Sequence, residues 1–126
     1  MRHLIFALPI LLASLPATAD KTITSNKTAA WDCAKDPTVH IMHGNGSYRF
    51  KGSCKSIIVQ GGNNQVVVEA VEQLQILGGN NTIEVGALDT ASIVGADNKL
   101  TWRKAMSGDQ PKVSTVGAGN QIAQAK

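Results

Sequence analysis

The chain has 126 residues, of which 12 are lysine or arginine and 9 are aspartate or glutamate, giving a formal net charge of +3 at pH 7. A chain of this size forms one small domain with a limited core. Aromatic residues make up only 4% of it and do not alternate with the basic side chains as a stacking platform requires, so we expect no nucleic-acid partner.

The first 19 residues have the three parts of a cleavable export signal in the right order. Arg2 and His3 form a positive start, residues 4–15 are almost wholly apolar, and residues 17–19 supply the small side chains that a signal peptidase reads. The apolar run covers 12 residues, whereas a membrane-spanning helix needs roughly 20. We therefore predict cleavage after Ala19, no membrane span afterwards, and a periplasmic or secreted location.

Residues 20–38 do not match the repeat that follows, and we predict that they form an N-terminal cap segment over the first coil. Cys33 lies in this segment and Cys54 lies beyond it. An even number of cysteines in an exported chain is typical of a structural disulfide, and two cysteines allow one pairing. The closed loop would stabilise the domain by about 3 kcal/mol. A redox or metal-binding pair is disfavoured, because the spacing is not C-x-x-C and no matching ligands accompany it.

Residues 39–126 contain a repeat of about 17 residues. Its units begin at Val39, Ile57, Leu74, Ala91 and Val113. The spacing is therefore 18, 17, 17 and 22 residues, the last lengthened by a loop around residues 107–111. Each unit has a short strand, a corner rich in glycine and asparagine, and a second short strand, with apolar residues at alternate positions. This alternation predicts half-buried β-strands, and the glycines and asparagines within the pattern argue against helix.

One asparagine recurs at the same place in the corners, as Asn64, Asn81, Asn98 and Asn120. In a parallel β-solenoid these side chains would stack as a ladder, each amide donating to one neighbour and accepting from another. A solenoid also explains the fixed repeat length, because each coil closes on the one below. We therefore predict an all-β, single-domain parallel β-solenoid of about five short coils with a disulfide-fastened N-terminal cap. The alternative is an antiparallel β-meander or sandwich, in which each corner is a hairpin.

Repeated Gly-x-Asn-Asn corners between strands rich in valine and isoleucine, with a cysteine pair near the first repeat, resemble the bacterial exported domain-of-unknown-function family 3060. The residues that carry this resemblance are Cys33, Cys54, residues 61–64, 78–81 and 95–98, and Trp102. They cover roughly residues 33–102. The resemblance implies an exported, solenoid-like domain, and it carries over no activity and no catalytic residue.

The position before each corner glycine carries Met42, Gln60, Leu77, Val94 and Val116. If these side chains pointed outward, they would form an apolar stripe suited to docking. If the chain turns inward at this position, they belong to the core, and this is the arrangement we expect. The C-terminal end, residues 122–126, has no distinct cap, and the pattern allows a homodimer through this end.

We find no catalytic, cofactor-binding or metal-binding pattern in the sequence. His40 and His43 lie close together, but no cysteine or carboxylate accompanies them at a ligand spacing, so we expect surface histidines. The chain also lacks the motifs of serine hydrolases, zinc proteases and phosphate-binding loops. Folding could still bring two carboxylates of the middle units together. These are Glu69, Glu72, Glu84 and Asp89.

A regular repeat without reactive groups favours a non-catalytic structural or interaction module, whose partner would be an envelope protein or a glycan. We therefore predict that the chain is not an enzyme and has no cofactor. Changes at outer positions such as Arg49 and Glu84 would then alter binding without altering folding. The alternative is a small glycan-active hydrolase, which would need two carboxylates within about 10 Å of each other beside a groove.

Overall fold

The computed structural model describes residues 20–23 and 28–125, so the predicted export signal lies outside the described part of the chain. These residues contain nine β-strands and no helix, and hence no helix that could cross a membrane. The strands are β1 (Asp20–Ile23), β2 (Thr28–Asp32), β3 (Thr38–Ile41), β4 (Ser47–Gln60), β5 (Gln65–Leu77), β6 (Thr82–Val94), β7 (Lys99–Ala105), β8 (Lys112–Val116) and β9 (Gln121–Gln124).

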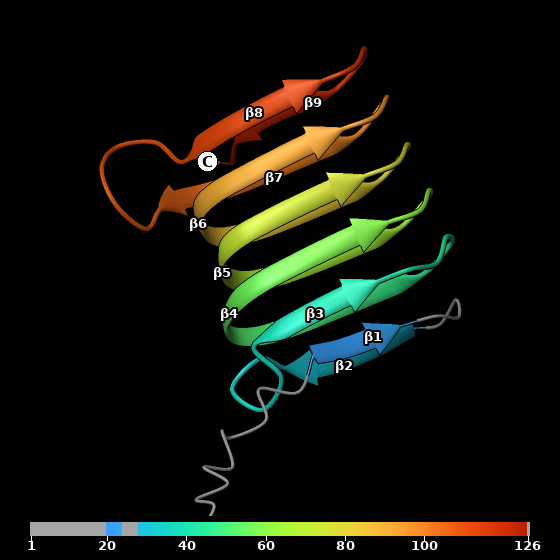
Figure 1. Ribbon diagram of the computed structural model, residues 1–126. Helices are drawn as coiled ribbons and strands as arrows, with labels where there is room; N and C mark the ends of the chain where they lie inside the picture. Colours follow the sequence, from blue (N-terminus) through green and yellow to red (C-terminus); the bar gives the residue numbers. More distant parts are fainter. Residues whose placement is uncertain (1–19, 24–27, 126) are drawn as a thin grey trace, which may run out of the picture.

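Every strand pairing among the described residues is parallel, and the pairings form two ladders. The ladder β1–β3–β4–β5–β6–β8 faces the viewer in Figure 1 and is named the front sheet. The ladder β2–β4–β5–β6–β7–β9 is the back sheet. Strands β4 to β6 belong to both, because each is 13 or 14 residues long and continues round a bend from the back sheet to the front sheet.

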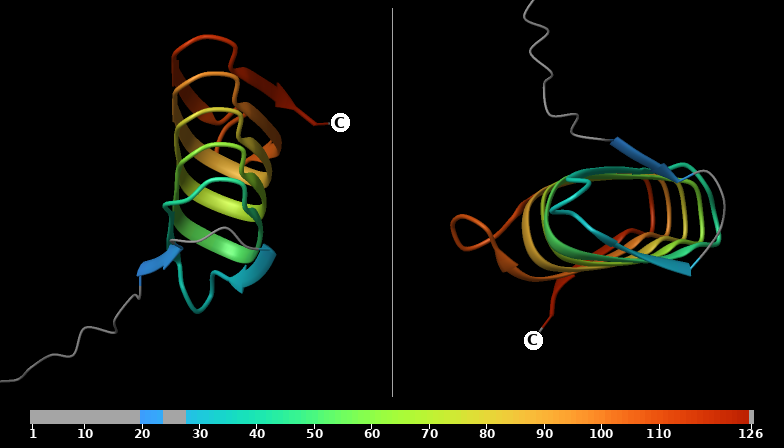
Figure 2. Two further views of the ribbon diagram at one scale, coloured as in Figure 1. Left: turned by 90° about the vertical axis from the view of Figure 1, so that its right-hand side faces the viewer. Right: turned by 90° about the horizontal axis from the view of Figure 1, so that it is seen from below.

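The chain therefore winds as a parallel β-solenoid of about five turns, which Figure 2 shows as a flattened tube in the view along its axis. This confirms the predicted all-β solenoid. The antiparallel meander is wrong for these residues, because the Gly-Asn corners carry the chain from one sheet to the other and do not fold a strand back onto its neighbour.

The inside of the tube is filled by the alternate apolar residues of both sheets. Ile57, Ile76 and Ile83 are typical, each with 0% of its surface exposed. Burying an aliphatic side chain of this size contributes about 1.5–3 kcal/mol, so these rows supply most of the favourable free energy of folding. The last rung differs from the others, because Ile122 is 37% exposed and Val113 is only partly buried.

Glycine is required at the first position of the corners that follow β4, β5 and β6, whereas His43 stands at this position in the corner after β3. Gly61, Gly78 and Gly95 have φ angles of 133°, 144° and 143°, a region that residues with a side chain rarely enter. Each glycine also stacks on its counterpart in the coil before, so that a Cβ on Gly78 would overlap the carbonyl oxygen of Gly61. The stacked backbones thus explain why this glycine recurs at a fixed interval.

The four corner asparagines form one hydrogen-bonded row inside the tube. Asn64 and Asn81 are 0% exposed and Asn98 is 1% exposed. The Asn81 Oδ1 accepts from the backbone N–H of Asn64 at 3.1 Å, and its Nδ2 donates to the Gly61 carbonyl at 2.9 Å and to the Asn98 Oδ1 at 3.0 Å. The Asn98 amide repeats this pattern toward Asn120. The row therefore satisfies corner backbone groups that the ladders leave unpaired.

The first corner lacks the asparagine because an aromatic ring occupies its place. Gly46 stands at this position, and its N–H donates to the Asn64 Oδ1 at 3.1 Å. A Cβ on Gly46 would overlap the ring of Tyr48, which is only 2% exposed. The degenerate first repeat thus keeps the backbone of the corner while replacing the amide with a buried tyrosine.

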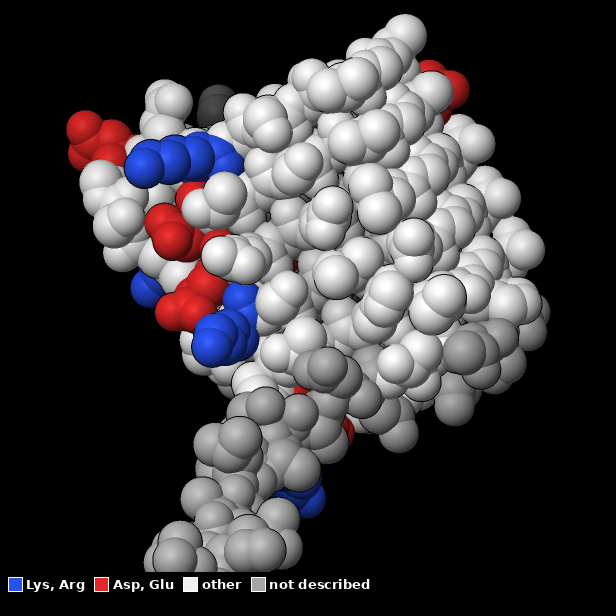
Figure 3. Space-filling view, in the orientation of Figure 1, with Lys and Arg blue, Asp and Glu red and all other residues white. Residues whose placement is uncertain are grey.

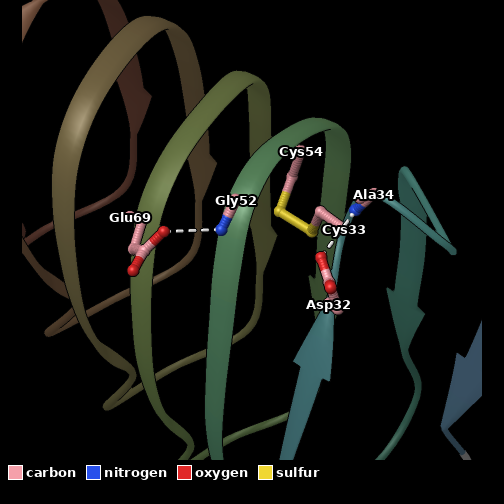
Figure 4. The surroundings of a disulfide bond; sticks show 6 residues. All are labelled: Asp32, Cys33, Ala34, Gly52, Cys54 and Glu69. Atoms are coloured by element: carbon pink, nitrogen blue, oxygen red, sulfur yellow. Dashed lines mark hydrogen bonds between the residues drawn. A yellow bond between two sulfur atoms is a disulfide. The ribbon is translucent and has the colours of Figure 1, made fainter.

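The predicted disulfide between Cys33 and Cys54 is confirmed, with the two Cα atoms 4.9 Å apart (Figure 4). Cys54 pairs in register with Val71, so the disulfide continues the buried row inside the bend. The predicted cap segment, residues 20–38, contributes β1 and β2, which pair in parallel with β3 and β4. The segment therefore adds a rung to both sheets, and the disulfide fastens that rung to β4.

Candidate interaction surface

The outward side chains of the front sheet form a flat surface, which we name the front face. Its three rows cross β3, β4, β5, β6 and β8. They are Thr38, Ser56, Gln73, Thr90 and Lys112; then His40, Ile58, Gln75, Ser92 and Ser114; and finally Met42, Gln60, Leu77, Val94 and Val116. Lys112 is the only lysine, arginine, aspartate or glutamate in these rows. Figure 3 shows the result as a broad expanse without charge.

The third row lies beside the corners, and we expected it to be part of the core. That expectation is wrong, because Met42 is 49% exposed, Val94 is 42% exposed and Val116 is 65% exposed. The strand alternation continues up to the corner, so the residue after the buried Ile93 points outward. The chain turns inward only at the asparagine, four residues later. The row is therefore the apolar margin of the front face.

Charged side chains gather on the back sheet and around the bend. The outward residues of the back sheet include Asp32, Arg49, Lys51, Glu69, Glu84, Lys99 and Arg103. In Figure 3 most of the visible charged side chains lie beside the bend, at the left of the front face, and a few acidic atoms are visible at its upper right edge. The two sheets therefore present different chemistry to solvent, one neutral and one carrying both signs of charge.

Two of the four candidate carboxylates meet at one depression on the back sheet. Glu69 and Glu84 line it together with Thr101 and Arg103, and its volume is about 380 Å³. Gly86 lies between them, and a Cβ at this position would overlap the Glu69 carbonyl oxygen. The depression thus forms where close contact between two coils excludes a side chain.

The depression offers little of what acid–base catalysis requires. Glu69 and Glu84 are both exposed to solvent. The Glu69 Oε2 already accepts from the backbone N–H of Gly52 at 2.6 Å, as Figure 4 shows. Catalytic carboxylates usually lie in a cleft that excludes water and gives the two carboxyl groups different pKa values. The other two carboxylates lie outside this depression: Glu72 is exposed, and Asp89 accepts from the Ser107 hydroxyl at 3.4 Å.

The two histidines do not converge on a common site. His40 lies on the front face, where its Nε2 donates to the Gln60 Oε1 at 2.6 Å. His43 stands at the first position of its corner, and its Nδ1 donates to the Gly44 carbonyl at 2.7 Å. Within residues 20–23 and 28–125, no group of three or more histidine, cysteine, aspartate or glutamate side chains could hold a metal ion.

The described tryptophan, tyrosine and phenylalanine side chains all lie away from the front face. Tyr48 and Phe50 are buried, and Trp102 is 7% exposed. Trp31 packs against this core at the N-terminal end, with its ring 5.9 Å from that of Phe50 and stacked on it. The front face therefore offers polar and aliphatic groups, and its only ring among the described residues is the imidazole of His40.

The other predicted site residues are structural. Cys33 and Cys54 lie inside the bend, and the asparagines from Asn64 to Asn98 lie inside the tube. None of these five residues reaches a surface on which a ligand could bind. The front face itself was not predicted, although a signal for it exists in the repeat. The outward positions of the first strand in the first four units carry no charge, whereas those of the second strand include Arg49, Glu84 and Lys99.

Comparison with protein families gives one match. Residues 45–87 and residues 71–119 match the family described as Protein of unknown function (DUF3060). The matched region contains the corners from Asn45 to Gly119, together with the stacked glycines and three of the four ladder asparagines. No curated protein and no solved structure matches the chain.

Proposed function

Since the chain belongs to the family described as Protein of unknown function (DUF3060), whose description carries no activity, we propose from its surface that it is an exported, non-catalytic interaction module that binds a partner protein of the cell envelope through the front face. The observation that carries the proposal is the contrast between the two sheets. The front sheet has a flat, nearly uncharged outer surface with an apolar margin. The outward positions of the back sheet carry charges of both signs.

An uncharged face suits a protein interface because contact removes almost no ionised side chain from water. The cores of protein interfaces are depleted in charged side chains, and exposed apolar groups that lie together often mark such sites. Met42, Val94 and Val116 provide the apolar part. Gln75 and Ser92 supply hydrogen-bonding groups on a backbone that the parallel ladder holds rigid.

A protein partner is favoured over a glycan by the placement of the aromatic residues. Small-molecule and sugar sites are commonly lined by aromatic side chains. Trp102 and Phe50 are in the core, and Trp31 packs at the N-terminal end, so no described tryptophan, tyrosine or phenylalanine ring is available on the front face. A glycan would have to bind by hydrogen bonds alone, in competition with water.

Export is supported by two independent features of the chain. Residues 1–19 have the order of a cleavable signal. The bond between Cys33 and Cys54 is of the kind that persists in oxidising compartments, whereas cytoplasmic thiols are kept reduced. Both features favour a periplasmic or secreted location.

Site-specific photo-crosslinking in the producing cell tests the front face directly. We expect a photoreactive residue at Gln75 or Val94 to give a covalent adduct with the same partner protein. Matched positions on the back sheet, Val67 and Glu84, should give no such adduct, so the proposal replaces the sequence-based expectation that changes at Glu84 alter binding. The substitution Ser92→Lys should abolish crosslinking from Gln75, since it places a charge in the contact. Adducts from the back-sheet positions only, or no common partner from the two front positions, would contradict the proposal.

The hydrolase alternative rests on Glu69 and Glu84, which share the depression over Gly86. We expect purified protein to release no reducing ends from cell-wall glycan. Glycan cleavage that the substitution Glu84→Gln abolishes, while the disulfide and the β-sheet circular dichroism stay intact, would make the chain an enzyme.

A further inference from the structure

The last two strands leave the ends of both sheets open. Within residues 28–125, β8 pairs only with β6 and β9 pairs only with β7, so each has one edge without a partner. The core is open at the same place. Ile122 is 37% exposed, whereas Leu100, its counterpart one coil earlier, is 0% exposed. We name this surface, formed by β8, β9 and the side chains between them, the C-terminal end.

Edge strands of stable proteins are usually protected by charged side chains, prolines or a covering segment. Residues 113–125 contain no lysine, arginine, aspartate, glutamate or proline. A depression of about 390 Å³ opens at this end; its surface is mostly polar, from residues such as Gln110 and Gln124, and Trp102, Val113 and Ile122 also line it. At the opposite end of the tube Trp31 packs over the aromatic core. The C-terminal end therefore has both unpaired backbone groups and uncovered apolar surface.

We propose that the C-terminal end binds the same end of a second copy, in a two-fold symmetric dimer. To pair with both β8 and β9, a partner must present two strand edges with an apolar strip between them. These edges must be as far apart as the two sheets of the solenoid. Another C-terminal end has this shape by definition. The two-fold axis reverses the strands of the second copy, so β8 and β9 meet their partners antiparallel, and the ladder hydrogen bonds continue across the contact.

The absence of charge is what makes this end self-complementary. In a two-fold contact each residue near the axis faces its own copy, so a charged side chain there would repel itself. Ser114, Ile122 and Ala123 are all neutral, and Lys112 lies at the margin. The contact uses the C-terminal end of both copies, so no third copy can bind there, and both front faces stay free. The inference is therefore independent of the function proposed above, although two linked front faces would strengthen binding to a repeated partner.

Sedimentation equilibrium of the oxidised protein over a wide range of concentrations tests the dimer. We expect a mass of twice the chain mass for the wild type. The substitution Ile122→Lys should give the mass of one chain, because it puts two like charges into the contact. The matched control Val116→Lys, in the same coil but on the front face, should remain dimeric. A monomeric wild type, a dimer that Ile122→Lys does not affect, or growth into longer oligomers would each overturn the proposal.

Hydrogen exchange provides a second measurement that needs no substitution. In the dimer the backbone N–H groups on the open edges of β8 and β9 become hydrogen-bonded, so their exchange should slow as the protein concentration rises. Amides of β5, in the middle of the solenoid, should exchange at a rate independent of concentration. Equal behaviour of β8, β9 and β5 would show that the C-terminal end stays free, whatever effect the variants have on folding.

Discussion

Adjacent asparagines in the corners have different roles. Asn80 has a φ angle of 58° and its side chain points to solvent, so it serves the backbone conformation. Asn81 is buried, and its amide forms three hydrogen bonds with neighbouring coils. The fourth repeat unit shows the distinction, because Asp97 replaces the first asparagine of the pair, with a φ angle of 59°, while the second asparagine remains as Asn98. A carboxylate is thus tolerated where only the backbone matters.

The substitution Asn81→Asp should lower the free energy of unfolding at neutral pH by about 3 kcal/mol or more. It removes both amide donors and places a carboxylate against the Gly61 carbonyl and the Asn98 Oδ1, which are acceptors. The control Asn80→Asp, which copies Asp97, should change the free energy by about 0.5 kcal/mol or less. Urea denaturation monitored by circular dichroism measures both.

The same variant should show a characteristic pH dependence. Burial raises the pKa of the introduced carboxyl above its value in the unfolded chain, so the folded state binds the proton more tightly. The loss relative to wild type is therefore smallest at acid pH and grows as the pH rises through the folded-state pKa. A difference that is constant with pH, or equal losses for the two variants, would show that the amide row does not carry the stability assigned to it.

At the scale of the elements, the first rung depends on a covalent bond more than the middle strands do. Strand β5 pairs with a long strand on both sides, whereas β1 and β2 have four and five residues and pair, among the described residues, on one side only. In a stacked repeat each element is stabilised by its neighbours, so a terminal rung opens first. The disulfide from Cys33 to Cys54 ties this weak rung to β4.

Replacing both cysteines by alanine should therefore lower the free energy of unfolding by about 3 kcal/mol. The loss of amide protection should be confined to β1, β2 and the turn after Asp32. Hydrogen exchange with peptide-level resolution measures this directly, and the reduced wild-type protein should behave in the same way. Equal loss of protection in β5 and β6 would mean instead that the disulfide governs the cooperativity of the whole solenoid.

The period-two pattern predicted most of the strand interior, since inward residues such as Ile57 and Leu100 are buried. It predicted two short strands in each unit and not one strand, β4, that runs from Ser47 to Gln60. Gly52, with a φ angle of 81°, lies where this strand bends. Nor could the pattern show that residues 20–38 form a rung. Parallel pairing depends on backbone hydrogen bonds, and these do not require the side chains of the repeat.

At the scale of the whole molecule, the flattened tube separates two surfaces that the linear sequence interleaves. Each coil contributes one strand to the front sheet and one to the back sheet, as Figure 2 shows. In the middle coils the outward residues of the front strand are uncharged, whereas those of the back strand include charged side chains. The row of Val94 and Val116 could not be assigned from the sequence, because its direction depends on where the corner turns inward. The corner asparagine makes that turn, and this places the apolar margin on the front face.

The stability of this architecture is coupled to its location, because the disulfide that holds the first rung forms only where thiols are oxidised. We expect the full chain, produced in a bacterium, to be recovered outside the cytoplasm with Asp20 as its first residue. Its mass should be lower by residues 1–19 and by the two hydrogens lost on oxidation of Cys33 and Cys54. A chain without residues 1–19 should remain in the cytoplasm with both thiols free and with unprotected amides in β1 and β2. Mass spectrometry before and after alkylation distinguishes the two forms, and recovery of the full chain uncleaved in the membrane fraction would contradict export with cleavage.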